Sequence, residues 1–258
     1  MTTDLDRDTL DGLDRELARR RAPEPFAPRT GDWCARDLLE GLERADVALD
    51  DAEVAELEPF FWFDICAEYD ARNLHRHLAA GGVDFSPEFR AFEEAWYRDE
   101  MNHYRGFLEL YCRLYGADAD EVAARVAARE PEFEPIDRFL DDEFRLAALF
   151  AYDELATTRA YFVDFELYRR MTDPRLMRFI RLLVRDESFH YQNAVAVLRH
   201  RHADRLAELP SVVDEFVRFD LGGHRYRGTF LFDHDWEHID RDFFRENGEI
   251  LLSRLAAS

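Results

Sequence analysis

One short pattern occurs twice in this chain, as Arg98-Asp99-Glu100-Met101-Asn102-His103 and again as Arg185-Asp186-Glu187-Ser188-Phe189-His190. Residues at i and i+3 of an α-helix project from one face, so each copy places a carboxylate beside an imidazole. One Glu-x-x-His is expected by chance in so acidic a chain, but a second copy behind the same Arg-Asp pair is not. The repetition predicts two helices that contribute matching faces to one site.

Each copy follows an isolated glutamate at nearly the same distance. Glu68 stands 32 residues before Glu100, and Glu154 stands 33 residues before Glu187, which allows one helix to run down and the next to return. Ferritin-like four-helix bundles hold two metal ions with such a set. We predict an all-α fold, a ferritin-like four-helix bundle with additional N- and C-terminal helices, and these metal ligands: Glu68, Glu100, His103, Glu154, Glu187 and His190.

Charge is consistent with this prediction, because two divalent cations would balance four glutamates in a buried site. A metal-bound imidazole usually donates its other N–H to a carboxylate. Asp99 and Asp186 suit that role, each toward the histidine one turn later or toward the histidine of the opposite helix, or they are simply solvated charges. The alternative for the whole pattern is a pair of solvated Glu and His faces on an acidic helical protein.

The composition indicates one helical domain. The chain has 258 residues, 47% of them hydrophobic, which is enough for one sizeable core. Apolar stripes and capping signals predict helices over 51–78, 87–114, 120–129 and 136–170, a fourth core helix from Pro174 that ends before Pro210, a short helix from 211 to the Gly222-Gly223 break, and a helix over 241–255. We expect 1–258 to form a single domain, with 1–50 as N-terminal arm and helix, 51–209 as core bundle and 210–258 as C-terminal cover.

The charge balance excludes some partners. With 56 acidic and 34 basic residues, the net charge is -22, which argues against nucleic acid and against anionic membrane surfaces. No apolar run is long enough for a membrane span or resembles a signal peptide, so we expect a soluble, cytoplasmic protein. Cys34, Cys66 and Cys112 form no close pair and are expected to be reduced core residues.

Two neighbours of the motifs suggest catalytic roles. Trp96 lies one turn before Glu100 and could pass electrons inward, although a Trp at helical spacing is more often core packing. Thr157 lies one turn after Glu154, and its hydroxyl either delivers a proton at the oxygen site or bonds back to a helix carbonyl. The remaining histidine pairs have no matched partners and are expected at the surface or at helix ends: His75 and His77, His200 and His202, His234 and His238.

The segments Ala95-Trp96-x-x-x-Glu100-x-x-His103, Glu154-x-Ala156-Thr157 and Asp186-Glu187-x-x-His190 resemble motifs of the soluble acyl-acyl-carrier-protein (stearoyl-ACP) desaturases, over roughly 68–198. The resemblance implies two irons, electron delivery by Trp96, an oxygen site beside Thr157, an external electron donor such as ferredoxin, and a homodimer. The chain is shorter than the plant enzymes, and Cys66-Ala67-Glu68-Tyr69 matches by position only. An acidic acyl-carrier protein would need a basic patch, for which the candidates are Arg169, Arg170, Arg175, Arg178 and Arg181, unless these are merely solvated.

We therefore expect an O2-dependent di-iron oxidoreductase that acts on unactivated C–H bonds, with O2 as co-substrate and either two Fe ions or a mixed Mn/Fe pair. The resemblance favours desaturation of an acyl chain on a carrier protein. The alternatives are a di-iron oxygenase or oxidase that tailors a natural product or amino acid, a ferroxidase or iron-storage protein, and a helical protein without metal. No hydrolase triad order, phosphate loop or G-x-G-x-x-G sequence is present, so electrons must come from outside.

Overall fold

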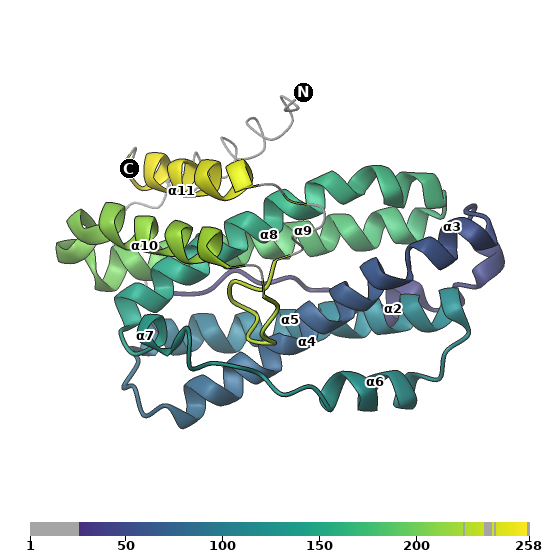
Figure 1. The fold of residues 1–258 in the computed structure, drawn as a ribbon, viewed down its shortest axis with the longest axis horizontal. Helices are drawn as coiled ribbons and strands as arrows, with labels where there is room; N and C mark the ends of the chain where they lie inside the picture. Colours follow the sequence, from purple (N-terminus) through teal and green to yellow (C-terminus); the bar gives the residue numbers. More distant parts are fainter. Residues whose placement is uncertain (1–25, 224, 235–238, 240, 257–258) are drawn as a thin grey trace.

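The computed structural model describes residues 26–223, 225–234, 239 and 241–256 (Figure 1). Over these ranges the chain is all-α, without a β-strand. Two short 3-10 helices, Arg44–Asp46 and Ala203–Glu208, accompany the following α-helices: α2 (Ala35–Leu39), α3 (Asp51–Glu56), α4 (Glu58–Ala80), α5 (Pro87–Tyr115), α6 (Ala119–Ala127), α7 (Asp137–Leu140), α8 (Glu143–Met171), α9 (Pro174–Arg201), α10 (Leu209–Gly222) and α11 (Arg241–Ala256). The helix expected near the N-terminus lies outside the described residues.

Four long helices form the body of the fold. α4 packs along α5, α8 packs along α9, and α5 packs against α9, so the two pairs form two layers (Figure 1). α10 and α11 cover α8 from the outer side, and α2 packs on both α5 and α9. Gly106 of α5 allows this close approach, because a Cβ there would lie 2.2 Å from Phe179 of α9 and 2.9 Å from Ala35 of α2.

Capping residues set the ends of the helices that carry the predicted ligands. The Ser86 hydroxyl accepts a hydrogen bond from the Phe89 amide at the start of α5, where Pro87 occupies the first turn. Gly116, with φ of 62°, ends this helix in the left-handed conformation that glycine adopts without strain. At the start of α9, Asp173 accepts from the Arg175 amide in the same way.

Three boundaries differ from the sequence prediction. The helix expected over 51–78 divides at Leu57, because Asp50 and Glu53 cap α3 reciprocally and Pro59 favours a fresh helix start. The helix expected over 136–170 divides before α8, where Asp142 accepts from the Phe144 amide. α9 ends before Pro210 as predicted, but the helix expected from 211 already begins at Leu209, so that Pro210 lies in the first turn of α10.

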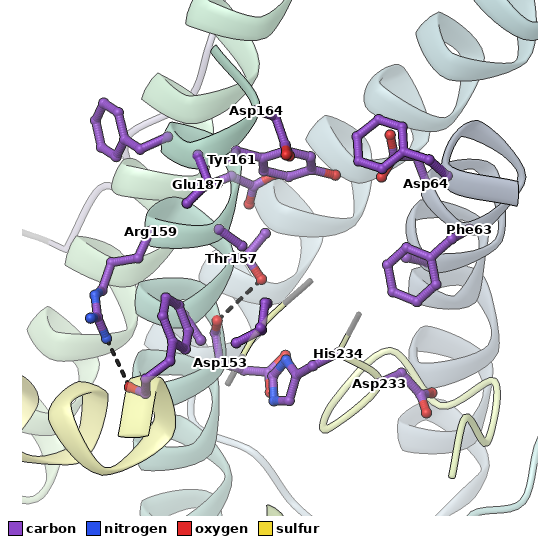
Figure 2. A pocket seen from close by; sticks show the side chains of 18 of the residues that line it. Phe63, Asp64, Asp153, Thr157, Arg159, Tyr161, Asp164, Glu187, Asp233 and His234 are labelled. Carbon is purple, nitrogen blue, oxygen red and sulfur yellow. Dashed lines mark hydrogen bonds and ion pairs between the residues drawn. The ribbon is translucent and has the colours of Figure 1, made fainter. Parts of the chain in front are cut away.

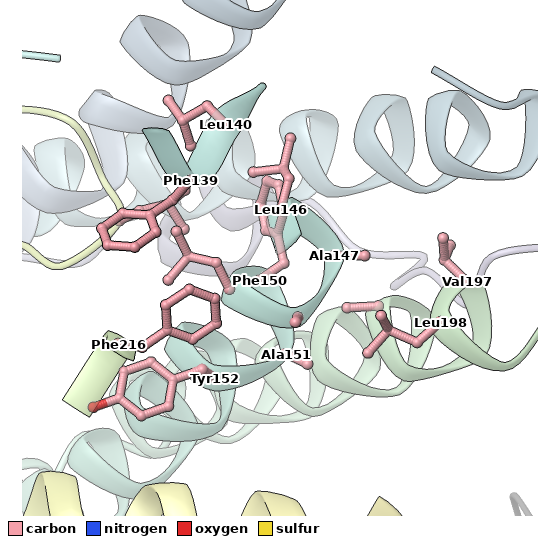
Figure 3. Close-up of a cluster of buried hydrophobic side chains, with 14 of the residues drawn as sticks. Phe139, Leu140, Leu146, Ala147, Phe150, Ala151, Tyr152, Val197, Leu198 and Phe216 are labelled. Carbon is pink, nitrogen blue, oxygen red and sulfur yellow. The ribbon is translucent and has the colours of Figure 1, made fainter. Parts of the chain in front are cut away.

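The main apolar core lies where α8 meets α9, α7 and α10. Phe139, Phe150, Tyr152 and Phe216 contribute large buried side chains there (Figure 3). The small Ala147 and other alanines of α8 let α9 come close. Each phenylalanine buried from water in this way contributes about 1.5–3 kcal/mol. Among the described helices, none combines the length and the apolar character needed to cross a membrane.

Candidate metal centre

The six predicted ligands come together in the middle of the four long helices. Glu68 lies on α4, Glu154 on α8, and the two Glu-x-x-His motifs on α5 and α9. Their side chains are 0–4% exposed. Charged groups are almost never buried to this extent unless they are paired or bind a metal. The doubled motif thus builds one buried cluster of carboxylates and imidazoles.

The cluster consists of two groups that share two members. Each group has donor atoms within 4.8 Å of one another: Glu68, Glu100, His103 and Glu187 in the first, and Glu100, Glu154, Glu187 and His190 in the second. Glu100 and Glu187 belong to both groups. They are therefore placed to bridge two metal positions, whereas each of the other ligands faces only one.

One oxygen of every glutamate in the cluster is buried without a hydrogen bond of good geometry to any described residue, although each lies 2.9–3.5 Å from an imidazole nitrogen. These oxygens are Glu68 Oε2, Glu100 Oε1, Glu154 Oε2 and Glu187 Oε1. A buried polar atom left in this state costs about 1–3 kcal/mol, and more when it is charged. Four such oxygens beside two imidazole nitrogens are a donor set suited to first-row transition metals.

The distances between donor atoms also fit a shared metal. The Nδ1 atom of His103 lies 3.2 Å from Glu187 Oε1 and 3.5 Å from Glu68 Oε2. The Nδ1 atom of His190 lies 2.9 Å from Glu100 Oε1. Two ligand atoms that are each about 2.1 Å from one metal, at roughly a right angle, lie about 3 Å apart. The residues present therefore fit a pair of metal ions.

The pKa shifts within the cluster also indicate a site that requires positive charge. Burial, followed by the charge of Glu100, raises the pKa of Glu68 well above its usual value, and burial likewise raises the pKa of Glu154. Burial opposes the charged form of His103, but its contacts with Asp186 and Glu100 outweigh burial and raise its pKa well above the usual value. When no cation is bound, protons on these groups supply the positive charge that the cluster requires.

The two aspartates of the repeated motif act across the helix pair. Asp186 Oδ2 lies 3.5 Å from Nε2 of His103, and Asp99 Oδ2 lies 3.7 Å from Nε2 of His190. Each aspartate thus faces the histidine of the opposite motif, one of the three positions that the sequence left open. A carboxylate in this position orients the ring so that Nδ1 faces the cluster.

Trp33, in the arm before α2, completes one of these contacts. Its indole Nε1 donates a 2.5 Å hydrogen bond to Asp186 Oδ2, and its ring stacks on His103 with 6.0 Å between ring centroids. Gly31 permits the approach, because a Cβ there would lie 2.5 Å from both carboxylate oxygens of Asp186. Sequence reasoning missed Trp33, which precedes the periodic helices and carries no motif.

The two lone glutamates are each held by an aromatic donor. Trp96 Nε1 donates a 2.7 Å hydrogen bond to Glu154 Oε1, and the Tyr161 hydroxyl donates to Glu68 Oε1. In both glutamates the other oxygen, Oε2, is the one that faces the cluster. Trp96 is fully buried against Phe150, so it serves as core packing as well as a hydrogen-bond donor. The role of Tyr161 was not predicted.

A cavity of about 980 Å³ opens beside the cluster, between α4, α8 and the segment that follows α10 (Figure 2). Three ligands, Glu68, Glu100 and Glu187, form part of its wall. Thr157 also lines it, and its hydroxyl donates to the Asp153 carbonyl at 3.1 Å, the ordinary bond back to the preceding helical turn. The cavity gives a small molecule access to the cluster from one side.

Phenylalanines and acidic residues share the rest of the cavity wall. Phe63 and Asp64 come from α4, whereas Asp233 and His234 come from the segment after α10 (Figure 2). Arg159 fastens α11 to this wall by donating to the Phe243 carbonyl at 3.0 Å and to Glu246 at 3.1 Å.

The remaining histidines lie outside the cluster. His75 pairs with Glu93 at 2.6 Å, His77 with Asp137 at 2.7 Å and His202 with Glu143 at 3.0 Å. The prediction of a surface or helix-end role is wrong for His234, whose side chain is 6% exposed and lies 3.3 Å from Asp220 and 3.6 Å from Asp153. Its predicted companion, His238, lies outside the described residues.

Other sequence expectations meet mixed outcomes. Burial raises the pKa of the Cys66 thiol to about 12, in line with a core position, but Cys34 is exposed, contrary to the prediction. Three arginines of the expected basic patch are engaged by carboxylates: Arg169 by Glu166, Arg170 by Glu53, and Arg175 by Asp46 and Asp173. Their charge is locally neutralised.

No protein-family model matches this chain, and neither the curated proteins nor the solved structures contain a match. Inferences about function therefore depend on the cluster and the cavity.

Proposed function

We propose that the protein is an O2-dependent di-iron oxidoreductase, with a ferritin-like bundle, that oxidises unactivated C–H bonds of an organic substrate bound in the cavity. One observation carries the proposal: Glu68, Glu100 and Glu187 belong to the ligand cluster and also line the cavity. A substrate in the cavity would therefore lie directly beside the metals. Two irons bound there supply the redox chemistry that couples O2 reduction to C–H oxidation.

In this proposal, different residues would bind the irons, orient the ligand histidines and hold a proton beside the site. Glu100 and Glu187 belong to both donor groups and would serve both irons, while the two lone glutamates would bind through Oε2 because Trp96 and Tyr161 occupy Oε1. Asp99 and Asp186 orient the imidazoles. The Thr157 hydroxyl, on the cavity wall one turn from Glu154, is placed to hold or pass a proton once it leaves the Asp153 carbonyl.

Electrons reach the site through Trp33 in this proposal, in place of the Trp96 route implied by the resemblance. Trp33 is only partly buried, whereas its Nε1 is bonded to Asp186 beside His103, so we assign to it the contact with an external donor such as ferredoxin. Trp96 is fully buried and packs against the rings of Phe150 and Phe230. A partly buried ring that stacks on a ligand imidazole offers a more accessible route from solution than the fully buried Trp96.

The cavity supports an elongated substrate. Its wall follows α8 from Asp153 to Arg169, and at 1.5 Å per residue these positions span about 24 Å. Phe162, Phe165 and Phe230 make much of this wall apolar, which suits an alkyl chain. Desaturation of a carrier-bound acyl chain remains our first candidate, with exposed Arg178 and Arg181 as the carrier contacts, since the other arginines of that patch are ion-paired.

The alternatives make less use of this arrangement. A ferroxidase or storage protein needs the ligands but not a cavity of about 980 Å³ against them. A metal-free helical protein would leave four buried carboxylate oxygens with two imidazole nitrogens to share and no hydrogen bond of good geometry among the described residues. An oxygenase that tailors a natural product uses the same cavity and ligands, and it is the second candidate.

An anaerobic Fe(II) titration of the apoprotein, followed by exposure to O2, tests the proposal. We expect two irons per chain, oxidation without a growing ferric mineral, and loss of binding in Glu100→Ala. Glu93→Gln is the matched control, because Glu93 is another histidine-paired glutamate of α5 but lies outside the cluster. Many irons per chain would indicate storage, and equal iron content in wild type and Glu100→Ala would refute the metal site.

A further inference from the structure

Tyr161 differs from the other aromatic residues of the cluster in facing both a ligand and the cavity. Its hydroxyl donates to Glu68 Oε1, its ring lies on the cavity wall, and it is 7% exposed (Figure 2). On the opposite side the ring stacks on Phe107, with 6.1 Å between centroids and 17° between planes. The phenol is therefore held in one orientation, with its proton directed at a metal ligand.

Trp96 provides the comparison. It makes the equivalent hydrogen bond to Glu154, but Phe150 and Phe230 enclose its ring within 4.9 Å. Trp96 does not line the cavity, whereas Tyr161 does. A phenol can lose an electron and a proton together along its O–H bond, and Tyr161 has a carboxylate in position to accept that proton. The ligand set is symmetric, but among the described residues only the Glu68 side has an oxidisable aromatic group that both bonds to a ligand and lines the cavity.

We propose that Tyr161 is a redox-active residue, an inference that rests on the proposed function. The oxidant is the iron pair after reaction with O2. The O–H bond of Tyr161 breaks, its electron passes to the oxidised iron pair through Glu68, and its proton passes to Glu68 Oε1, which already accepts the hydrogen bond. The product is a neutral tyrosyl radical and an iron pair reduced by one electron.

Oxidation of Tyr161 is expected when no substrate occupies the cavity. Reduction of O2 to water requires more electrons than a pair of ferrous ions supplies, and the substrate C–H bond provides the remainder. With the cavity empty, Tyr161 is the oxidisable side chain of the described cavity wall that is hydrogen-bonded directly to a ligand carboxylate. The radical should therefore accumulate in the absence of substrate and decline when a substrate fills the cavity.

The test is freeze-quenched EPR of Fe(II)-loaded protein exposed to O2 without substrate, after iron stoichiometry has been measured. We expect an organic radical signal that narrows when the protein is made with ring-deuterated tyrosine, and that disappears in Tyr161→Phe. Tyr168→Phe is the matched control, since Tyr168 is a buried tyrosine two turns further along α8 and should leave the signal unchanged. Peptide mass spectrometry should also find oxidised products at Tyr161.

The outcomes separate the two proposals. If wild type binds two irons and reacts with O2 but gives no tyrosyl signal, or if the signal survives in Tyr161→Phe, the redox role is overturned while the di-iron site stands. If wild type binds no iron, both proposals fail. Iron stoichiometry equal to wild type in Tyr161→Phe shows that the variant has folded, and ring deuteration of the wild-type protein requires no substitution at all.

Discussion

The crossed contacts between aspartates and histidines lead to a prediction about metal affinity. Asp186 lies on α9 but contacts His103 of α5, with 3.5 Å between Asp186 Oδ2 and His103 Nε2. Removing a carboxylate that orients a ligand histidine typically costs 10–100-fold in metal affinity, which corresponds to about 1.4–2.7 kcal/mol. Asp186→Asn should therefore weaken the metal position that Glu68 and His103 share.

The burial and contacts of each aspartate determine how large a loss of metal affinity we expect when it is replaced by asparagine. Asp186 is 1% exposed and also accepts from Trp33, so we expect a loss near the upper end of that range. Asp99 is 7% exposed and lies 3.7 Å from His190, and no indole donates to it among the described residues; an arginine lies beside each aspartate, Arg98 beside Asp99 and Arg185 beside Asp186. Asp99→Asn should therefore fall near the lower end.

Double-mutant cycles measured by chelator-competition titration would check the crossing. Asp186 acts through His103, so Asp186→Asn should cost little in a His103→Ala background and its full amount in a His190→Ala background. Asp99→Asn should show the reverse preference. If Asp186 instead couples to His190, its neighbour on the same helix, or to neither histidine, the crossed arrangement is refuted.

Three further predictions concern other parts of the molecule. Gly106→Ala would force a Cβ to 2.2 Å from Phe179 and should destabilise the fold by about 1–3 kcal/mol in urea unfolding. Trp33→Phe removes the bond to Asp186, so reduction of the iron pair by ferredoxin should slow by about tenfold, with unchanged iron content by metal analysis. The charges of Asp220 and Asp153 outweigh burial and raise the pKa of His234 to about 9, which at about 1.4 kcal/mol per unit from an unfolded value near 6.5 is worth about 3 kcal/mol. This stability is fully present below about pH 6.5 and is lost as the pH rises through about 9, so unfolding free energies of wild type and His234→Gln should converge above that pH.

The ligand cluster could be predicted because its information is local. Glu100 and His103 are three residues apart on one helix, and the second motif repeats the arrangement, so helical periodicity alone places each pair on one face. The helix starts at Ser86 and Asp173 were predictable for the same reason, since a cap and its helix are adjacent in sequence.

The rest of the site depends on contacts between distant segments. Trp33 and Asp186 are 153 residues apart, and Tyr161 and Glu68 are 93 apart. Neither pair leaves a periodic signal, because one contact depends on how α8 packs against α4 and the other on how the arm packs against α9. The division of the first predicted helix at Leu57 was also missed, since its apolar stripe continues across a break that is set by capping.

The hydrogen bonds of Trp33 and Tyr161 have one more consequence, for metal selection. Both converge on the position formed by Glu68 and His103, one from the arm and one from the cavity, while the position formed by Glu154 and His190 is enclosed by the aromatic core around Trp96. Two positions with matching ligands but unlike surroundings differ in their exchange with solvent and in their reduction potential. If the proposed pair of ions binds, the first and the second ion would meet unlike surroundings, which is a physical requirement for holding iron and manganese in a fixed order.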